Sequence, residues 1–302
     1  MRTGNNRIAP KQGFPSHKRA CYRFFMHPIN HELNMEDGTS LFVSDYLLEQ
    51  GSARGGVVIM HGLGEHCGRY RHVAEYLNQA GWSVRTYDHR GHGQSQGRRG
   101  DVLRQSDLLD DAKSVVDEFA LRCGESPFLL GHSMGGLFAA HFALAKLSPL
   151  RGLVLSSPAL SVPITGFQKA LLKLMVAVAP HAGFSNRLKS QFLSHDALVV
   201  AAYRADPLVH GKISGILLSA MLASMRFCEA HAATLAIPAL MLVAGDDRLV
   251  DAKGSKRFFA QLPRGLARLS WYDDFFHEVF NEPERAQPLA ELRAWLETQD
   301  AL

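Results

Sequence analysis

The sequence predicts an α/β fold in which helices flank a mostly parallel central sheet and a helical segment is inserted between two strands. Short apolar runs alternate with longer helical patterns along most of the 302 residues. The apolar runs are continuous, which is typical of strands buried on both faces of a parallel sheet. Residues 161–236 break this rhythm, because they carry helical patterns and no clear strand. One catalytic domain with an insertion is therefore expected.

Two segments at the start of the folded region predict a β-hairpin. Residues 31–36 and 41–48 have strand character and are joined around Asp37-Gly38. Glycine readily adopts the positive φ that a tight turn needs, so this dipeptide is a common hairpin turn.

The remaining strands and helices of the sheet domain follow from apolar runs and helical periodicity. The predicted strands are residues 56–60, 82–87, 128–130, 153–155, 239–243 and 268–272. The predicted helices are residues 71–79, 103–122, 134–147, 252–262 and 283–299. Repetition of strand, helix and strand indicates a doubly wound sheet.

The inserted segment is expected to form a helical cap on this domain. The predicted division is a core at residues 24–160 and 237–302, with the cap at residues 161–236. Helical patterns in the cap cover residues 167–179, 197–204 and 213–230. Residues 170–179 are apolar on nearly every face, with Lys173 as their single charge. This helix is either buried against the core or partly exposed as a surface for acyl chains or membrane.

Charge is distributed unevenly along the chain. The net charge is +4, but residues 1–23 carry +6 without one acidic residue, which leaves −2 for the rest. Pro10, Gly13 and Pro15 break any helix there, so residues 1–23 are expected to be a basic, disordered arm. The arm could touch anionic lipid or nucleic acid, but a merely solvated arm is the preferred interpretation and no nucleic-acid partner is expected.

No apolar run reaches the ~18 residues that a spanning helix needs, and no signal-peptide pattern is present. Cys21, Cys67, Cys123 and Cys228 are too sparse for a disulfide framework or a zinc site. We therefore expect a cytoplasmic protein with free thiols and with no metal or other cofactor.

The pentapeptide Gly131-His132-Ser133-Met134-Gly135 matches G-x-S-x-G, and its context gives the match weight. An apolar strand precedes it and a helix begins at Met134, which is the strand-turn-helix setting of a nucleophile elbow. The serine there holds a positive φ, so its neighbours must lack bulk, and Gly131 and Gly135 satisfy that requirement. Ser133 is the predicted nucleophile.

A serine hydroxyl needs a histidine to take its proton and a carboxylate to orient that histidine. His277 lies beyond the last predicted strand, at the sheet edge where open α/β sheets bind ligands, and is the predicted base. The acid should follow strand 239–243. Asp247 is preferred over Asp246, which directly follows the turn glycine, and over Asp251, which begins the next helix as an N-cap.

The oxyanion formed during acyl transfer needs two inward-facing amides. One is expected from Met134, after the nucleophile, and the other from Leu63, in the glycine-containing loop after strand 56–60. His61 and His132 are interpreted as braces for these loops. Residues 88–95 lack the spacing of a phosphate loop or a metal site, so they are predicted to form a structural turn.

With these motifs in place, the sequence resembles the monoacylglycerol lipase and lysophospholipase family of α/β-hydrolases from about residue 31 to the C-terminus. The shared motifs are His61-Gly62-Leu63-Gly64-Glu65-His66, Gly68-Arg69-Tyr70, Asp88-His89-Arg90-Gly91-His92-Gly93-Gln94-Ser95, Gly131-His132-Ser133-Met134-Gly135-Gly136, Asp247-Arg248-Leu249-Val250-Asp251 and His277-Glu278 with Asn281-Glu282-Pro283.

The resemblance implies a Ser133, Asp247 and His277 triad, an oxyanion hole at Leu63 and Met134, and a cap that lines an acyl tunnel. It also implies substrate-binding candidates near the head group: Glu65, Arg69, His132 and Tyr203. The implied partner is a small lipid ester. The resemblance also implies peripheral contact of the protein with a membrane or micelle surface.

The leading expectation is a serine hydrolase that cleaves monoacylglycerols or similar single-chain esters. Lysophospholipase, general carboxylesterase, thioesterase and aminopeptidase activities use the same residues, so likeness of fold does not separate them. A catalytically silent lipid-binding protein on the same scaffold is the alternative from another class.

Overall fold

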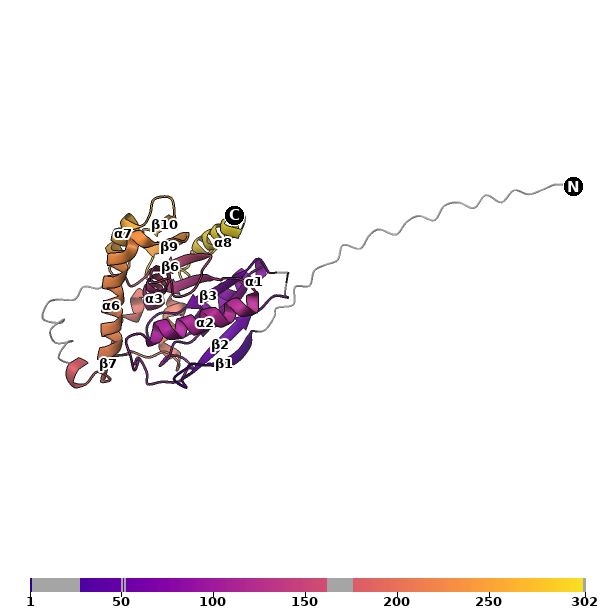
Figure 1. Cartoon of the computed structure of the whole chain (residues 1–302). Helices are drawn as coiled ribbons and strands as arrows, with labels where there is room; N and C mark the ends of the chain where they lie inside the picture. The colour runs from indigo at the N-terminus through magenta and orange to yellow at the C-terminus, as the bar shows by residue number, and fades with distance from the viewer. Residues whose placement is uncertain (2–27, 50, 52, 162–175, 301–302) are drawn as a thin grey trace.

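The computed structural model describes residues 1, 28–49, 51, 53–161 and 176–300, which form one eight-stranded sheet with helices on both faces (Figure 1). The sheet order is β1-β2-β4-β3-β5-β6-β9-β10. Its strands are β1 (Ile29–Asn34), β2 (Ser40–Tyr46), β3 (Gly56–Met60), β4 (Ser83–Tyr87), β5 (Phe128–His132), β6 (Gly152–Ser156), β9 (Ala239–Ala244) and β10 (Ala267–Tyr272). The predicted α/β class is confirmed.

The sheet is parallel from β4 to β10, and the hairpin β1–β2 adds two antiparallel strands at one edge. β3, β5, β6 and β9 are buried at every residue, as their continuous apolar sequences predict. The hairpin turns at Gly38, whose φ is +83°.

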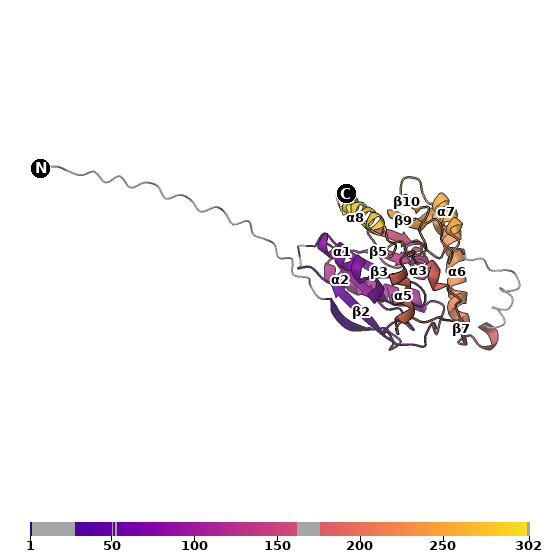
Figure 2. The ribbon, with the colours of Figure 1, turned by 180° about the vertical axis from the view of Figure 1, so that it is seen from behind.

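The sheet separates the core into two apolar layers, and helices cover each of them. α1 (Arg71–Gln79) and α8 (Ala286–Asp300) pack on one face of the sheet, and the indole of Trp295 lies in that layer. The other face carries α2 (Asp107–Cys123), α3 (Met134–Leu144), α6 (Gly215–His231) and α7 (Ala252–Gln261). α2 lies in front of the sheet in Figure 1, and α1 lies in front of it in the reverse view of Figure 2.

α2 begins at Asp107, four residues after residue 103, the start predicted from helical periodicity. The carboxylate of Asp107 accepts hydrogen bonds from the amides of Leu103 and Arg104 at 2.8 and 2.9 Å. These bonds close a turn before the first helical residue, so apolar periodicity alone misplaced the start.

The inserted segment contains α5 (Ala197–Ala205) and α6, in agreement with two of its three predicted helices. It also contains a short antiparallel pair that was not predicted, β7 (Gly183–Ser185) and β8 (Lys212–Ser214). Strands of three residues are too short to produce a recognisable alternation. The predicted helix at residues 167–179 and the basic arm at residues 1–23 lie largely outside the described residues, and the core-and-cap division stays a prediction.

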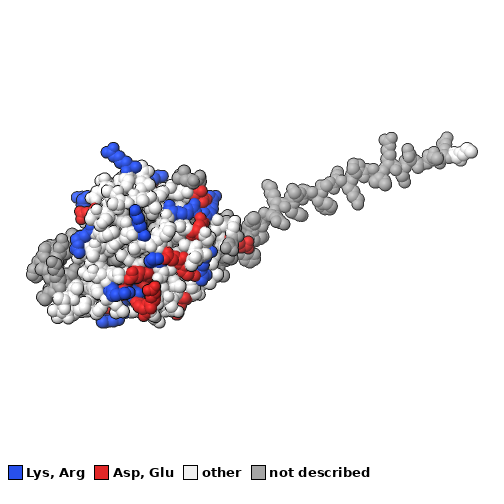
Figure 3. Space-filling view, viewed as in Figure 1, with Lys and Arg blue, Asp and Glu red and all other residues white. Residues whose placement is uncertain are grey.

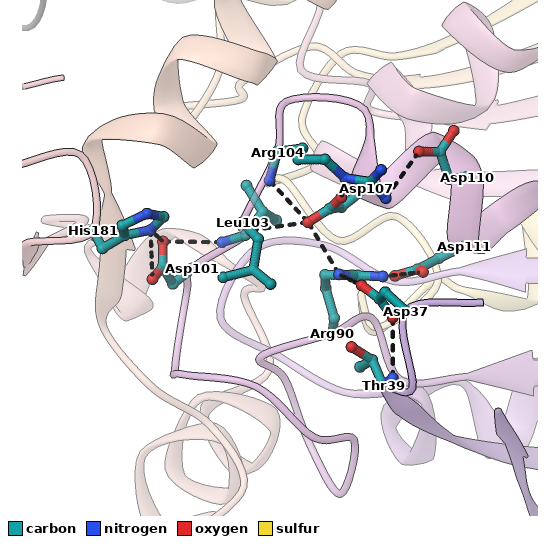
Figure 4. Close-up of polar contacts among 11 residues, drawn as sticks. Asp37, Thr39, Arg90, Asp101, Leu103, Arg104, Asp107, Asp110, Asp111 and His181 are labelled. Atoms are coloured by element: carbon teal, nitrogen blue, oxygen red, sulfur yellow. Dashed lines mark hydrogen bonds and ion pairs between the residues drawn. The ribbon is translucent and has the colours of Figure 1, made fainter. Parts of the chain in front are cut away.

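The loop at residues 88–95 has a structural role, because Arg90 anchors it between the hairpin turn and α2 (Figure 4). Its guanidinium, nearly buried, donates to Asp111 at 2.5 and 2.6 Å, to Asp37 at 2.8 Å and to Asp107 at 3.0 Å. The bond from Arg90 lowers the pKa of Asp37 to about 2. On this face of the molecule, acidic and basic side chains lie next to one another (Figure 3).

We predict that Arg90→Gln destabilises the protein by about 3–5 kcal/mol, because it leaves Asp111 buried without its cation and Asp107 with only the exposed Arg104. The exposed neighbour Arg98 is the matched control, and Arg98→Gln should change stability by no more than about 0.5 kcal/mol. Urea unfolding of both variants checks this; equal stabilities would show that the network contributes little.

Candidate active site

Ser133 lies between β5 and α3 in a strained backbone conformation, with φ of 53° and ψ of −116°. Its amide donates to the carbonyl of Ser156 at 3.0 Å, and its own carbonyl accepts from Ala159 at 2.9 Å. A Cβ at Gly131 or Gly135 would overlap backbone carbonyl oxygens, so both positions require glycine. A non-glycine residue in such a conformation costs about 1–3 kcal/mol and is a common feature of active sites.

His277 and Asp247 form a buried hydrogen-bonded pair. Nδ1 of His277 donates to Oδ2 of Asp247 at 2.6 Å, and the two side chains are 5% and 0% exposed. Oδ1 of Asp247 accepts from the amides of Leu249 and Val250 at 2.9 and 3.0 Å, which fixes the carboxylate. With Nδ1 committed to Asp247, Nε2 of the neutral imidazole is the ring nitrogen left to accept a proton.

Electrostatics strengthens this pair despite its burial. Burial opposes the charged form of both groups, but the charge of Asp247 and its hydrogen bond outweigh burial and raise the pKa of His277 above its ordinary value. Burial likewise opposes ionisation of Asp247, and the interaction with His277 outweighs it and lowers the pKa of the carboxyl. The pair therefore favours a carboxylate beside an imidazole that accepts protons readily.

The other two aspartates of this loop face elsewhere. Asp246 forms an ion pair at the surface with Arg248 at 2.6 Å. Asp251 accepts from the amide of Lys253 at 3.0 Å as the N-cap of α7, and it lies 3.1 Å from Arg257. Of the three candidates, the structure places Asp247 against the predicted base.

His132 connects the serine turn to the predicted base. The imidazole rings of His132 and His277 are 4.7 Å apart, and Nδ1 of His132 lies 3.0 Å from the hydroxyl of Ser156. Burial and then the charge of His277 lower the pKa of His132 to about 3, so it is neutral at ordinary pH. This neutral ring packs between the two loops without adding charge to them.

The loop after β3 lies against the serine turn. A Cβ at Gly62 would be 3.3 Å from the Cβ of Ser133, and Gly135 packs against the carbonyls of Met60 and His61. This close packing brings the start of α3 beside the residues that precede Leu63. The predicted amide donors, those of Leu63 and Met134, therefore belong to adjoining segments.

His61 braces this loop. Its Nε2 accepts from the amide of His89 at 3.0 Å, so Nδ1 carries the proton and donates to the carbonyl of Gly62 at 2.7 Å. Burial and the neighbouring His89 lower the pKa of His61 well below its ordinary value, which keeps this arrangement neutral. Asp88 adds a second brace, with its carboxylate accepting from the amides of Cys67 and Gln94, both at 2.7 Å.

Glu65 and Arg69 belong to a buried cluster that also contains Glu278. The guanidinium of Arg69 contacts Oε2 of Glu65 at 2.7 Å and both oxygens of Glu278 at 2.6 and 2.7 Å. Oε1 of Glu65 accepts from the amide of Gly62 at 2.6 Å. The ring of Tyr203, on α5, lies 4.7 Å from the guanidinium. The carboxylate of Glu65 and the guanidinium of Arg69 are thus paired within the protein.

The cluster has an electrostatic effect close to the base. Burial opposes ionisation of both carboxyls and raises the pKa of Glu65, whereas for Glu278 the guanidinium outweighs burial and lowers the pKa. The negative charge of Glu278, next to His277 in sequence, also contributes to the raised pKa of that imidazole.

Glu278 and Glu282 are further residues of this region for which no role was predicted. Both are buried; Glu278 directly follows His277, and Glu282 accepts from the amide of Phe276. Buried carboxylates need partners, so two of them within five residues of a predicted base were a usable signal. In the part of the chain that the structure describes, no group of three or more His, Cys, Asp or Glu side chains is placed to hold a metal ion.

Comparison with known proteins shows the family to which the chain belongs. The family model for serine aminopeptidase, S33 matches residues 51–284. The chain is similar to a monoacylglycerol lipase of Mycolicibacterium smegmatis, with 34% identity over 80% of this chain and 88% of the relative. It is also similar to a phospholipase of Bacillus subtilis, with 32% identity over 79% of this chain and 93% of that protein.

A solved structure supports the same assignment. The monoacylglycerol lipase of Paleococcus ferrophilus superposes with a TM-score of 0.76 at 32% identity, over 91% of this chain and 100% of that one. The predicted resemblance is confirmed in both sequence and fold. The chain therefore belongs to the serine aminopeptidase S33 family of α/β-hydrolases.

Proposed function

We propose that this protein hydrolyses the carboxylic ester of single-chain lipids, with monoacylglycerols as the preferred class. One observation carries the proposal: Ser133 is held at positive φ on a strand-turn-helix, and the ring of the preceding residue, His132, lies 4.7 Å from the ring of His277, which is hydrogen-bonded to the buried Asp247. The relatives named as monoacylglycerol lipases support the choice of substrate.

In the proposed mechanism, the hydroxyl oxygen of Ser133 attacks the ester carbonyl while Nε2 of His277 takes the hydroxyl proton. Asp247 stabilises the imidazolium that forms. The amides of Leu63 and Met134 donate to the carbonyl oxygen as it becomes negative. Collapse of this intermediate returns the proton from His277 to the leaving alcohol, glycerol in the case of a monoacylglycerol, and leaves an acyl ester on Ser133.

Deacylation repeats the same steps with water. His277 takes a proton from the water while its oxygen attacks the acyl carbon, and the proton then returns to Ser133. The products are the free serine and a fatty acid.

The surface of the inserted segment supports contact with a lipid surface. The exposed residues of α5 are one arginine, Arg204, and five apolar residues: Ala197, Leu198, Ala201, Ala202 and Ala205. Leu198 is 80% exposed, and Val178 is 76% exposed in the same inserted segment. Large apolar side chains this exposed are consistent with a surface that meets lipid. None of the described helices is long and apolar enough to cross a membrane, so the proposed contact is peripheral.

Lysophospholipid hydrolysis is the second candidate, because the similar Bacillus subtilis protein is named a phospholipase. Lysophospholipid hydrolysis would use the same catalytic residues, and only the leaving head group would differ. A panel of monoacylglycerols, lysophospholipids and p-nitrophenyl esters with one acyl chain length would rank these classes.

We predict that Ser133→Ala abolishes ester hydrolysis and labelling by a fluorophosphonate probe while the fold remains intact, because only the attacking oxygen is lost. Hydrolysis of p-nitrophenyl butyrate, probe labelling and a thermal unfolding curve check the three parts. Activity above a few per cent of wild type would identify another nucleophile, and a wild-type protein that neither reacts nor hydrolyses would indicate a silent scaffold.

We predict that Asp247→Asn lowers kcat by about 10⁴-fold, as expected when the carboxylate that orients a catalytic base is removed. Asp246→Asn is the matched control one residue away, and it should retain most of the activity because Asp246 pairs with Arg248 at the surface. Steady-state kinetics on a soluble ester compares them. A dead Asp246→Asn variant beside an active Asp247→Asn variant would reverse the assignment.

We predict that kcat/KM falls as pH decreases through the pKa of His277, because only the neutral imidazole accepts the serine proton. Since that pKa is raised, the loss should begin above the pH at which an ordinary histidine titrates, about 6.5. A pH profile with p-nitrophenyl butyrate checks this. Activity that is retained well below pH 6 would contradict the raised pKa.

A further inference from the structure

Glu282 is a buried carboxylate. It has no role in the proposed mechanism and is not among the residues proposed to bind the head group. It lies in the connection between β10 and α8 and is 0% exposed. Its Oε1 accepts from the amide of Phe276 at 2.6 Å, and its Oε2 accepts from the amide of His195 at 3.1 Å. One carboxylate thus holds the residue before His277 and the segment that leads into α5.

Residues 192–195 contact the His277 loop at several further points. The amide of Glu278 donates to the carbonyl of Leu193 at 2.9 Å, and the amide of His277 lies 3.4 Å from the carbonyl of Phe192. The hydroxyl of Ser194 donates to the carbonyl of Asn281 at 2.8 Å. Both sides of His277 are therefore held by the inserted segment.

Aromatic packing completes this contact. The imidazole of His195 stacks on the ring of Phe276 with centroids 3.6 Å apart, and the ring of Phe192 meets Phe276 edge-on at 5.8 Å. The guanidinium of Arg248, from the loop that carries Asp247, lies 5.1 and 5.0 Å from these two phenyl rings. The acid loop, the base loop and the inserted segment thus meet at one junction.

We infer that Glu282 is a positioning residue for the His277 base, acting through its bonds to the amides of Phe276 and His195. This inference rests on the proposed function, since it concerns the residue that activates Ser133. A base displaced by about 1 Å from its productive position costs on the order of 100-fold in rate. The inserted segment is then part of the support for the base.

The test compares Glu282→Gln with Glu284→Gln, an exposed glutamate two residues away. Glutamine keeps the volume of Glu282 but offers one acceptor oxygen where two amides need acceptors, so one bond is lost. We expect kcat on p-nitrophenyl butyrate to fall about 10- to 100-fold with KM nearly unchanged. Glu284→Gln should behave as wild type.

The pH profile separates positioning from simple loss of folded protein. Asp247, Glu278 and Glu65 raise the pKa of His277, and the neutral ring of His132 packs on it. If the loop that carries His277 is loosened, the hydrogen bond from His277 to Asp247 weakens and the pKa of His277 falls. The acid limb of the profile, which is the decline of kcat/KM at acid pH, should therefore move to lower pH in Glu282→Gln. Partial unfolding would lower the rate equally at all pH values and leave the limb in place.

His195→Ala provides a second variant in case Glu282→Gln folds poorly. The His195 side chain is 46% exposed, so its removal spares the core. It removes both the stack on Phe276 and the contact of Nδ1 with the two carboxylate oxygens of Glu282, at 3.1 and 3.2 Å. We expect a smaller loss of kcat and a shift of the acid limb in the same direction.

Two outcomes overturn the inference: wild-type kinetics in Glu282→Gln, or a loss of activity in both variants without any movement of the limb. Neither outcome would affect the proposed function, which fails only if the wild-type protein itself does not hydrolyse esters or react with the fluorophosphonate probe.

Discussion

Ser133 holds a backbone conformation that costs about 1–3 kcal/mol, and much of the surrounding structure serves to keep it there. The glycines on either side allow β5 and α3 to approach without a Cβ, and backbone bonds from β6 and the loop after it fix the turn. Because α3 then packs against the end of β3, the loop that carries Leu63 is brought to the same edge of the sheet. The geometry of the proposed oxyanion hole follows from the turn at the nucleophile.

Three buried charged groups near the site and beneath α2 each have several partners. Arg69 lies between two carboxylates, Asp247 accepts from two amides and an imidazole, and Arg90 meets three aspartates. The histidines that brace the loops are neutral instead, because burial lowers the pKa of each. A buried histidine with a lowered pKa supports a loop without the cost of a desolvated charge.

Sequence patterns predicted the sheet well, because parallel strands buried on both faces leave continuous apolar runs such as those of β3 and β9. The same patterns led to the proposal of Ser133, Asp247 and His277 as the triad, since each follows a strand at the same edge of the sheet. They did not predict β7 and β8, or the junction around Glu282, because these depend on pairing between residues about 25 to 90 positions apart. Local periodicity carries no information about such contacts.

The Arg69 cluster has a consequence for the end of the reaction. In the buried part of the site, Asp247, Glu65 and Glu278 provide three carboxyl groups, and Arg69 is the guanidinium that lies among them. In the proposed mechanism, the fatty acid released from Ser133 ionises at neutral pH and then carries the same negative charge as the carboxylates of Asp247 and Glu278. Like charges repel more strongly where water is excluded. The arrangement that favours protonation of the base therefore also favours departure of the anionic product over its return.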